Sequence, residues 1–419
     1  MSDDAPNLHD ALAERGLIAQ CTDPAMRERL ATPATLYCGF DPTANSLHVG
    51  SLVPIMALAH AQRCGHKPLV LVGGATARVG DPSGKDASRA MLAPEEIDAN
   101  AHDIAAQIGR IVDFDHGPTG AELVNNLDWI GPLSWLDVLR DVGSKVSVNR
   151  MMTMESVRSR MTGDGQFITY LEFSYMLLQA LDFAHLGRAR GCRVQLGGQD
   201  QWGNIVMGTE LGRKLHGLDL AGLTLPLVTK ADGAKFGKSE SGNVWLDKER
   251  TPVFAFFQFW RNAADADVGR FLRYFTFLPV AEIEELEAAT GAGINAVKAR
   301  LAYEVTRLVH GEEEAAAARD AAERTYGGGG GGADADGLPH ASLDLSEPVG
   351  VVELLKRAGF AKSNGEARRL IQGGGVRVHD QKVGEPLAAV SAADARAGRV
   401  LLRAGKKRLF RFDVTGAPS

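Results

Sequence analysis

Short apolar runs alternate with longer amphipathic stretches through the first half of the chain. The runs have the length and composition of buried strands, and they cover residues 35–40, 67–74, 193–198 and 223–228. Helical spacing is found in residues 50–63, 94–112, 171–185 and 202–215. Strands that alternate with helices predict an α/β fold with a parallel sheet, and such sheets bind ligands at the carboxyl ends of their strands.

The pattern changes in the second half of the chain. From about residue 249 to residue 325 helical spacing dominates, which predicts a helical domain. Residues 327–337 then begin with six consecutive glycines, a composition typical of a flexible linker. Residues 350–415 return to a compact mixture of apolar and polar positions, which predicts a further small domain.

Composition and cysteine usage narrow the class of protein. The chain has 419 residues, of which 45% are hydrophobic and 23% charged, as in soluble globular proteins. Its longest apolar stretch, 52–61, is too short to span a bilayer, and the acidic N-terminal segment does not resemble a secretory signal. The four cysteines are widely scattered, so we expect no disulfide framework, no zinc site and a reducing cytoplasm.

Charge is distributed unevenly along the chain. The net charge of −6 divides into +8 for residues 350–419 and −14 for the remainder. A basic segment on an acidic body indicates a polyanionic partner for that segment. The alternative is a basic surface that merely faces solvent.

Two polar motifs follow the first predicted strand. Asp41, Pro42 and Thr43 come directly after it, and His48, Val49 and Gly50 open the next predicted helix. Backbone N–H groups at a helix start attract anions, Gly50 allows a close approach to the backbone, and His48 can donate a hydrogen bond to a phosphate. The alternative for His48 is an ordinary helix-capping side chain.

Two further loops carry candidate phosphate-binding cations. GDPSGK (80–85) is followed by Arg89, and its spacing does not fit a complete P-loop. TKADGAKFGKSES (229–241) places Lys235, Lys238 and Ser239 in a glycine-bearing loop, which suits transient binding of a polyphosphate. The alternative is a solvated lysine loop.

These motifs together resemble those of the class I aminoacyl-tRNA synthetases, which carry a His-x-Gly element and a lysine–serine loop. Four sequence motifs are similar to those of bacterial tyrosyl-tRNA synthetases: YCGFDPTANSLHVG, GDPSGK, GGQDQWGNI and KFGKS. The resemblance extends over residues 5–415. The resemblance implies a Rossmann-like parallel-sheet catalytic domain (1–228), the signature loop (229–248), an α-helical domain (249–326), a glycine-rich linker (327–347) and a small α+β RNA-binding domain of the S4 type (348–419).

A polar stripe in an apolar helix is the candidate amino-acid pocket. Tyr175, Gln179 and Asp182 are spaced to share one helical face, and the alternative is that this face points to solvent. The resemblance implies that Tyr175, Gln179 and Asp81 hold the α-ammonium of tyrosine. It also implies that Tyr37 and Asp182 bind the phenolic hydroxyl, with Asn126 nearby.

The resemblance also assigns the ATP site and the chemistry. It implies that Gly198 and Asp200 contact the ribose with Cys38 nearby, and that Gln201 contacts the reacting carboxylate; a helix-capping role is the alternative for Asp200. Thr43 and His48 would bind the γ-phosphate, beside Gly39, Asp41 and Gly50. The departing pyrophosphate would be held by Lys85, Arg89, Lys235, Lys238 and Ser239. We expect Mg²⁺ to accompany ATP, and no acidic cluster marks a dedicated metal site.

The resemblance implies tyrosine tRNA as the partner of the basic segment and a homodimer with its interface near residues 130–165. The S4-like residues expected to meet RNA phosphates are Arg368, Arg369, Lys382, Lys406, Lys407 and Arg408. Ser51, Asn45 and the pair Ala77-Arg78 depart from the wording of the family. The alternatives are a tryptophanyl-tRNA synthetase and an RNA-binding relative without catalytic activity.

Overall fold

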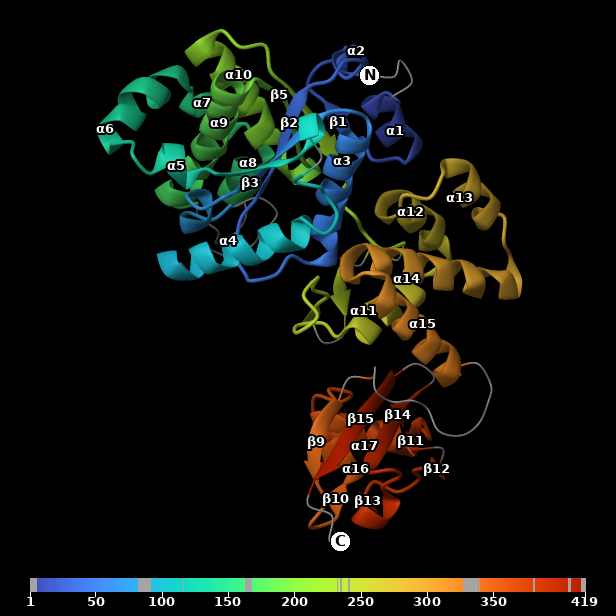
Figure 1. The fold of residues 1–419 in the computed structure, drawn as a ribbon. Helices are drawn as coiled ribbons and strands as arrows, with labels where there is room; N and C mark the ends of the chain where they lie inside the picture. The colour runs from blue at the N-terminus through green and yellow to red at the C-terminus, as the bar shows by residue number, and fades with distance from the viewer. Residues whose placement is uncertain are drawn as a thin grey trace. The chain divides into compact units, whose positions relative to one another are not determined.

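The chain forms two compact units in a computed structural model (Figure 1). The residues that the structure describes are 6–81, 92–115, 117–162, 168–231, 233, 236–239, 242–326, 338, 340–379, 381–405 and 408–415. The first unit comprises Met1–Gly237, Trp245–Asp247 and Ala263–Leu301. The second unit comprises Lys238–Val244, Lys248–Asn262 and Ala302–Ser419.

A six-stranded sheet forms the centre of the first unit. Its strands lie in the order β1 (Gln20–Cys21), β6 (Ala221–Leu225), β5 (Cys192–Gly198), β2 (Thr35–Phe40), β3 (Lys67–Val72) and β4 (Glu122–Asn125). All neighbours pair in parallel except β1, which runs antiparallel to β6. The predicted α/β fold with a parallel sheet is therefore confirmed.

The strands differ from the prediction in their bounds and in their number. β3 ends at Val72 and not at residue 74, and β5 begins at Cys192, one residue earlier than predicted. β6 ends at Leu225 and not at residue 228, because Pro226 has no N–H to continue the ladder. β1 was not predicted because it has only two residues. β4 was not predicted because it is an edge strand of four residues, and a partly exposed edge strand can carry polar residues such as Glu122 and Asn125.

The main helices connect the strands by crossovers. They are α3 (Leu52–Arg63), α4 (Pro94–Ile108), α9 (Tyr170–Arg190) and α10 (Trp202–His216). The steps from β2 to β3 and from β5 to β6 run in opposite directions across the sheet, so right-handed crossovers place α3 and α10 on opposite faces, as Figure 1 shows. The order in which successive strands are added to the sheet therefore reverses between β2 and β5, and parallel sheets bind ligands at such a point.

Local sequence fixes the two ends of α9, the helix that carries the polar stripe. At its start Thr169 and Glu172 form a capping box, in which each side chain accepts a hydrogen bond from the backbone of the other residue. At its end Gly191 adopts a left-handed conformation with φ 64° and stops the helix. The predicted helix 171–185 is thus confirmed and extended by five residues at its C-terminal end.

The helical segment after residue 249 does not form one separate domain as predicted. α12 (Asp265–Phe275) and α13 (Val280–Glu287) belong to the first unit, where α12 packs against α3. Arg15, in the loop after α1 (Leu8–Glu14), donates hydrogen bonds to the carbonyl groups of Thr276 at 3.0 Å and Leu278 at 2.6 Å, and so fixes the end of α12 to the N-terminal segment. In the second unit α11 (Val253–Arg261) packs against α15 (Glu312–Tyr326), and α14 (Ile294–His310) spans the division between the units.

The C-terminal part of the chain has its own sheet and core, so the predicted small α+β domain is confirmed. The sheet order is β12 (Gln381–Lys382), β11 (Val376–Val378), β14 (Arg399–Ala404), β15 (Arg408–Thr415) and β9 (His340–Asp344). α16 (Val351–Arg357) and α17 (Asn364–Gln372) enclose a core that includes Leu354, Ile371 and Phe412. The predicted linker, 327–347, is too long, because β9 pairs in parallel with β15 and belongs to this domain.

The remaining short helices and strands complete the description. They are α2 (Met26–Arg29), α5 (Leu127–Ile130), α6 (Trp135–Asp137), α7 (Val148–Met152), α8 (Glu155–Thr162), β7 (Lys238–Ser239), β8 (Gly242–Asn243), β10 (Val349–Gly350) and β13 (Ala389–Val390). All four cysteines are free thiols, which confirms that no disulfide links the chain. Within the described residues, every helix is too short or too polar to cross a bilayer.

Candidate active site

The polar stripe on α9 faces the interior of the first unit. Tyr175 is 5% exposed and Asp182 is 2% exposed, while Gln179 between them is partly buried. The alternative of a solvent-facing stripe is therefore wrong. Buried polar side chains need partners, and the partners come from loops at the carboxyl ends of β2, β3, β4 and β5.

Asp182 is held at one end of this pocket by two donors. Asn126 Nδ2 donates to Asp182 Oδ2 at 3.0 Å, and Trp129 Nε1 donates to Asp182 Oδ1 at 2.9 Å. Burial raises the pKa of Asp182 to about 8, although the hydrogen bonds from Asn126 and Trp129 lower it. Trp129 was not predicted, because nothing in the segment LDWI distinguishes this tryptophan from a packing residue. Its indole also stacks on the ring of His185, with the ring centroids 4.6 Å apart.

Two polar atoms in the same region have no hydrogen-bond partner among the described residues. Tyr37 is 1% exposed, and its hydroxyl is one of them. The other is Oε1 of Gln195, which lies opposite Tyr37 in the pairing of β2 with β5. Burial and then the charge of Asp182 raise the pKa of Tyr37, so its hydroxyl is neutral. A buried hydroxyl without a partner, next to a buried carboxylate, fits a ligand that brings its own polar group.

A chain of hydrogen bonds links the Asp182 end of the pocket to the loop after β2. Asn126 Nδ2 also donates to Thr76 Oγ1 at 3.1 Å, and Thr76 Oγ1 donates to Asp41 Oδ1 at 2.7 Å. Tyr175 donates its hydroxyl proton to Asp41 Oδ2 at 2.8 Å. Asp41, which the resemblance placed in the ATP site, therefore holds a residue of the amino-acid pocket.

A second chain of hydrogen bonds joins the other predicted pocket residues. Gln201 Nε2 donates to Asp81 Oδ2 at 2.7 Å. Asn204 Nδ2 donates to Gln201 Oε1 and to Gln179 Oε1, both at 3.0 Å. Asn204 is only 3% exposed and was not predicted, although it lies in the segment GGQDQWGNI. The structure thus brings Asp81, Gln179 and Gln201 together from three separate segments.

His48 occupies the turn between β2 and α3. Its Nδ1 accepts a hydrogen bond from the Gly50 backbone N–H at 3.0 Å, so the neutral ring carries its proton on Nε2. Partial removal of the imidazole from water lowers the pKa of His48, which favours this neutral form. His48 Nδ1 therefore caps the helix start, as in the alternative interpretation, and His48 Nε2 remains available as a hydrogen-bond donor. A side chain at residue 50 would displace the imidazole, because a Cβ there would lie 2.7 Å from His48 Cε1.

Two residues of the signature loop (229–248), Gly237 and Trp245, lie beside this turn. Gly237 has φ 81°, and a Cβ built there would lie 3.1 Å from Val49 Cγ2 and 3.8 Å from the Gly50 nitrogen. Trp245 forms a β-bridge with His48. Lys85, Arg89 and Lys235 lie outside the described residues, as do the side chains of Lys238 and Ser239. The two signature segments therefore meet at His48, Val49 and Gly50.

The other predicted ATP-site residues surround the carboxyl ends of β2 and β5. Gly39 is exposed and Thr43 is partly buried, while Cys38 is buried and burial raises the pKa of its thiol to about 12. Asp200 is exposed and lies two residues after Gly198. The surrounding protein partly removes its carboxylate from water, and this desolvation, followed by the charge of Asp81, raises its pKa. The capping alternative for Asp200 is wrong, because the N-cap positions of the helical turns are Gly198 and Gln201.

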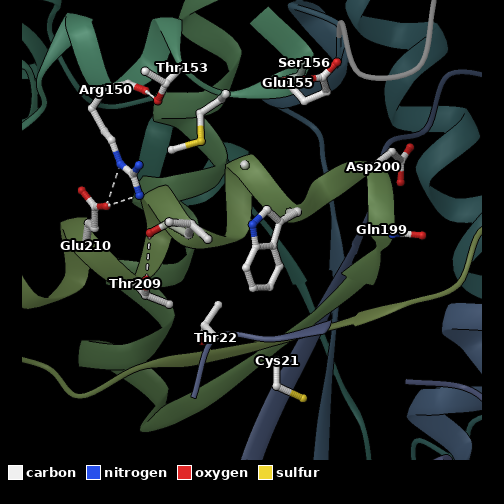
Figure 2. A pocket seen from close by; sticks show the side chains of 14 residues that line it. Cys21, Thr22, Arg150, Thr153, Glu155, Ser156, Gln199, Asp200, Thr209 and Glu210 are labelled. Atoms are coloured by element: carbon white, nitrogen blue, oxygen red, sulfur yellow. Dashed lines mark hydrogen bonds and ion pairs between the residues drawn. The ribbon is translucent and has the colours of Figure 1, made fainter. Parts of the chain in front are cut away.

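A cavity of about 820 Å³ lies beside the first turns of α10 (Figure 2). It is lined by the start of α10, by Asp200 and by residues around α7 and α8. An ion pair between Arg150 and Glu210, 3.2 Å apart, crosses part of its wall. Tyr37, Tyr175 and Asp182 do not line it, so this cavity is not the predicted amino-acid pocket.

The predicted RNA-binding residues of the C-terminal domain differ in exposure. Arg368 and Arg369 are exposed on α17, and Lys382 is exposed on β12, with its Nζ close to Gly374 in the turn after α17. Arg408 is partly buried and donates to the Phe360 carbonyl at 3.1 Å, so its guanidinium has a structural partner. Lys406 and Lys407 lie outside the described residues.

Comparisons with known proteins match two parts of the chain to family descriptions. Residues 29–327 match the family described as tRNA synthetases class I (W and Y). Residues 333–412 match the tyrosine–tRNA ligase SYY-like C-terminal domain. The second match begins before β9 and therefore agrees with the corrected start of the small domain.

The relatives and solved structures are similar over most of the chain. A tyrosine–tRNA ligase of Aliivibrio fischeri is 48% identical, covering 96% of this chain and 97% of the relative, and one of Dechloromonas aromatica is 47% identical with the same coverage. A truncated mitochondrial tyrosyl-tRNA synthetase of Aspergillus nidulans superposes with a TM-score of 0.66 at 33% identity, covering 75% of this chain and 92% of the other. A tryptophanyl-tRNA synthetase of Encephalitozoon cuniculi, at 12% identity and a TM-score of 0.53, covering 74% of this chain and 87% of the other, shares the fold alone.

Proposed function

The chain belongs to the class I tRNA synthetases of the tryptophan and tyrosine family and acts as a tyrosine–tRNA ligase, and we propose that the two hydrogen-bond chains described above form its tyrosine site. The observation that carries this proposal is the buried Tyr37 hydroxyl without a partner, next to the Asp182 carboxylate. A tyrosine phenol placed there donates to Asp182 and pairs with Tyr37. Phenylalanine would leave these polar groups unpaired, and tyrosyl-tRNA synthetases are already a known example of strong selection of this kind without editing.

The proposed first step joins tyrosine to ATP. A carboxylate oxygen of tyrosine attacks the α-phosphorus of ATP, an O–P bond forms, and the bond to pyrophosphate breaks. The catalytic residues position the reactants and stabilise charge on the phosphates, so no covalent bond to the protein is required. Gln201, whose Nε2 has a second proton beyond the one donated to Asp81, orients the tyrosine carboxylate.

The phosphates are assigned to the turn at His48. Its Nε2–H donates toward the γ-phosphate, and the backbone N–H groups at the start of α3 favour an anion there. Lys85, Arg89, Lys235, Lys238 and Ser239 are proposed to hold the departing pyrophosphate. We assign Mg²⁺ to the ATP phosphates, because no three acidic, histidine or cysteine side chains cluster in the described part of the chain.

A variant of His48 tests this assignment. His48→Ala removes the Nε2 donor, and we expect tyrosine binding to stay close to normal while the rate constant of adenylate formation falls on the order of tenfold or more. Rapid-quench measurement of that single step separates the two effects. A normal rate constant would exclude His48 from the chemistry.

In the second step a ribose hydroxyl of the 3′-terminal adenosine of tRNA attacks the carbonyl carbon of tyrosyl-adenylate, and AMP leaves. The partner is tyrosine tRNA, and the exposed cations on α17 and β12 are proposed to contact its phosphates. A cytoplasmic location is proposed on the free thiols, which a reducing compartment would preserve.

An exposed apolar surface supports a homodimer. Among the residues that the structure describes, ten of the twelve exposed large hydrophobic side chains lie between residues 123 and 171, and they include Trp135 (56% exposed), Leu136 (73%) and Tyr170 (61%). Such concentration marks a protein interface, and residues 130–165 were predicted to form it. Leu136→Glu should convert the dimer to a monomer in sedimentation analysis; a wild-type chain that sediments as a monomer would refute the proposal.

The decisive assay is exchange of labelled pyrophosphate into ATP with purified protein. Tyrosine should support exchange, whereas tryptophan and phenylalanine should not. Exchange with tryptophan would favour the tryptophanyl-tRNA synthetase. No exchange with any amino acid, while tRNA still binds, would favour the inactive RNA-binding relative.

A further inference from the structure

One carboxylate sets the direction of every hydrogen bond in the second chain. Asp81 can only accept, so Gln201 must turn its amide NH₂ toward Asp81 and its carbonyl oxygen toward Asn204. Asn204 must then present its own NH₂ to Gln201. The second proton of that NH₂ goes to the carbonyl oxygen of Gln179.

Asn204 is well placed to enforce this order. It lies in the first turn of α10, directly after the loop that carries Gln201, and only 3% of it is exposed. If the buried amide of Asn204 were turned around, its own oxygen would face both carbonyl oxygens, and both hydrogen bonds would be lost.

We propose that Asn204 is a positioning residue that fixes the amide orientation of both substrate-contacting glutamines. Its donation keeps the Gln179 oxygen fixed, with a second lone pair open to the tyrosine ammonium, and keeps the NH₂ of Gln201 toward Asp81 and the tyrosine carboxylate. The inference rests on the proposed tyrosine site, since it assigns a role to Asn204 only through Gln179 and Gln201.

The test compares two substitutions that differ in shape and polarity. Asn204→Asp keeps the shape but replaces the donor with oxygens that face two carbonyl oxygens. Asn204→Ala removes the donor and leaves a small gap. If polarity decides, Asn204→Asp should lower kcat/KM for tyrosine in pyrophosphate exchange about 100-fold and Asn204→Ala about tenfold, since a buried unpaired group costs more than a lost bond. If packing decides, the order should reverse.

A double-mutant cycle separates positioning from general stability. In a Gln179→Ala, Gln201→Ala background the acceptors are gone, so adding Asn204→Ala should change kcat/KM less than twofold. All variants are assayed at the same pH, and rates are normalised to titrated active sites. Asn262→Asp, which adds the same charge at an exposed position, serves as the control and should behave as wild type.

Three results would overturn the inference: Asn204→Asp within twofold of wild type, Asn204→Asp milder than Asn204→Ala, or additive effects in the cycle. Failure of the proposed function would look different, because the wild-type protein itself would then show no tyrosine-dependent exchange. A variant that merely unfolds would show a lower melting temperature and fewer active sites, with an unchanged KM for tyrosine in the remaining fraction.

Discussion

The proposed amino-acid pocket of the first unit and the basic surface of the C-terminal domain use polar residues in opposite ways. In the pocket Asn126, Asp182 and Asn204 are at most 3% exposed, and each bonds to side chains from other segments. On the C-terminal domain Arg368 and Arg369 are exposed and lie side by side on one short helix. The first arrangement depends on the fold of a whole sheet, and the second depends on nine residues of α17.

This difference implies that one region selects the amino acid and the other attracts RNA. A buried polar group that loses its partner costs about 1–3 kcal/mol, so the pocket penalises any ligand that lacks a matching group. An exposed cation attracts phosphates from many directions and is screened by salt, so it adds affinity without geometric demand. We therefore expect choice of amino acid to depend on the pocket and salt-sensitive RNA binding to depend on the C-terminal domain.

The largest effect is expected from Asp182→Asn. The substitution keeps the volume but sets a new NH₂ against the donors of Asn126 or Trp129, and removes the acceptor proposed for the tyrosine phenol. The loss should be about 3 kcal/mol, or on the order of 100-fold in kcat/KM for tyrosine in pyrophosphate exchange. Rates are normalised to titrated active sites, so that a loss of folded protein is not counted as a loss of selectivity. A loss below threefold would show that Asp182 does not select the substrate.

The second prediction uses the raised pKa of Asp182, about 8 in the chain without ligand. If the ionised carboxylate accepts the phenol proton, KM for tyrosine should fall up to tenfold for each pH unit from about pH 6 to about pH 8 and then level off. The dependence should be absent in Asp182→Asn. A KM that rises over this range would show instead that the protonated acid binds the substrate.

The same shift has a consequence for stability with a defined sign. The pKa of Asp182 is raised above its ordinary value of 3.8, so the folded chain holds a proton that the unfolded chain releases. Its contribution to the free energy of unfolding is fully present below about pH 4 and is lost as pH rises to about 8. Denaturant titrations of wild type and Asp182→Asn should therefore diverge over that range.

How far the sequence predicts the site depends on whether the residues share an element. Tyr175, Gln179 and Asp182 lie on one helix, so their spacing predicted a common face. Tyr37 and Gln201 lie in segments that the resemblance had already assigned. The strands β2, β3 and β5 were also predictable, because buried parallel strands read as continuous apolar runs.

The residues that hold the site in place could not be predicted in the same way. Trp129 reaches Asp182 from a short helix 53 positions away, and Asn204 reaches Gln179 from 25 positions away. No periodicity connects such pairs, and only the strand order brings them together. β9 was missed for a similar reason: its pairing partner, β15, is at the other end of the domain.

A smaller effect is expected from Trp129→Phe. The phenyl ring keeps an aromatic face toward His185 but loses the Nε1 donor to Asp182, which should cost about 1.5 kcal/mol, or about tenfold in kcat/KM for tyrosine. Trp260→Phe is the matched control: it changes a buried indole of the second unit, so it should lower the melting temperature without affecting KM. Equal KM in both variants would remove Trp129 from the pocket.

The smallest effect is expected on the basic surface. Arg368→Ala should leave tyrosine-dependent exchange unchanged and weaken tRNA binding severalfold, because it removes one exposed cation among several. The plot of log affinity against log salt should become shallower by about 0.7 to 0.9, the share of one phosphate contact. Lys356→Ala on α16, where the ammonium shares Glu353 at 3.7 Å with Arg357, should change that slope less than Arg368→Ala does. Equal changes of slope in both variants would show that RNA is attracted by the total positive charge of the surface and not by the cations of α17 in particular.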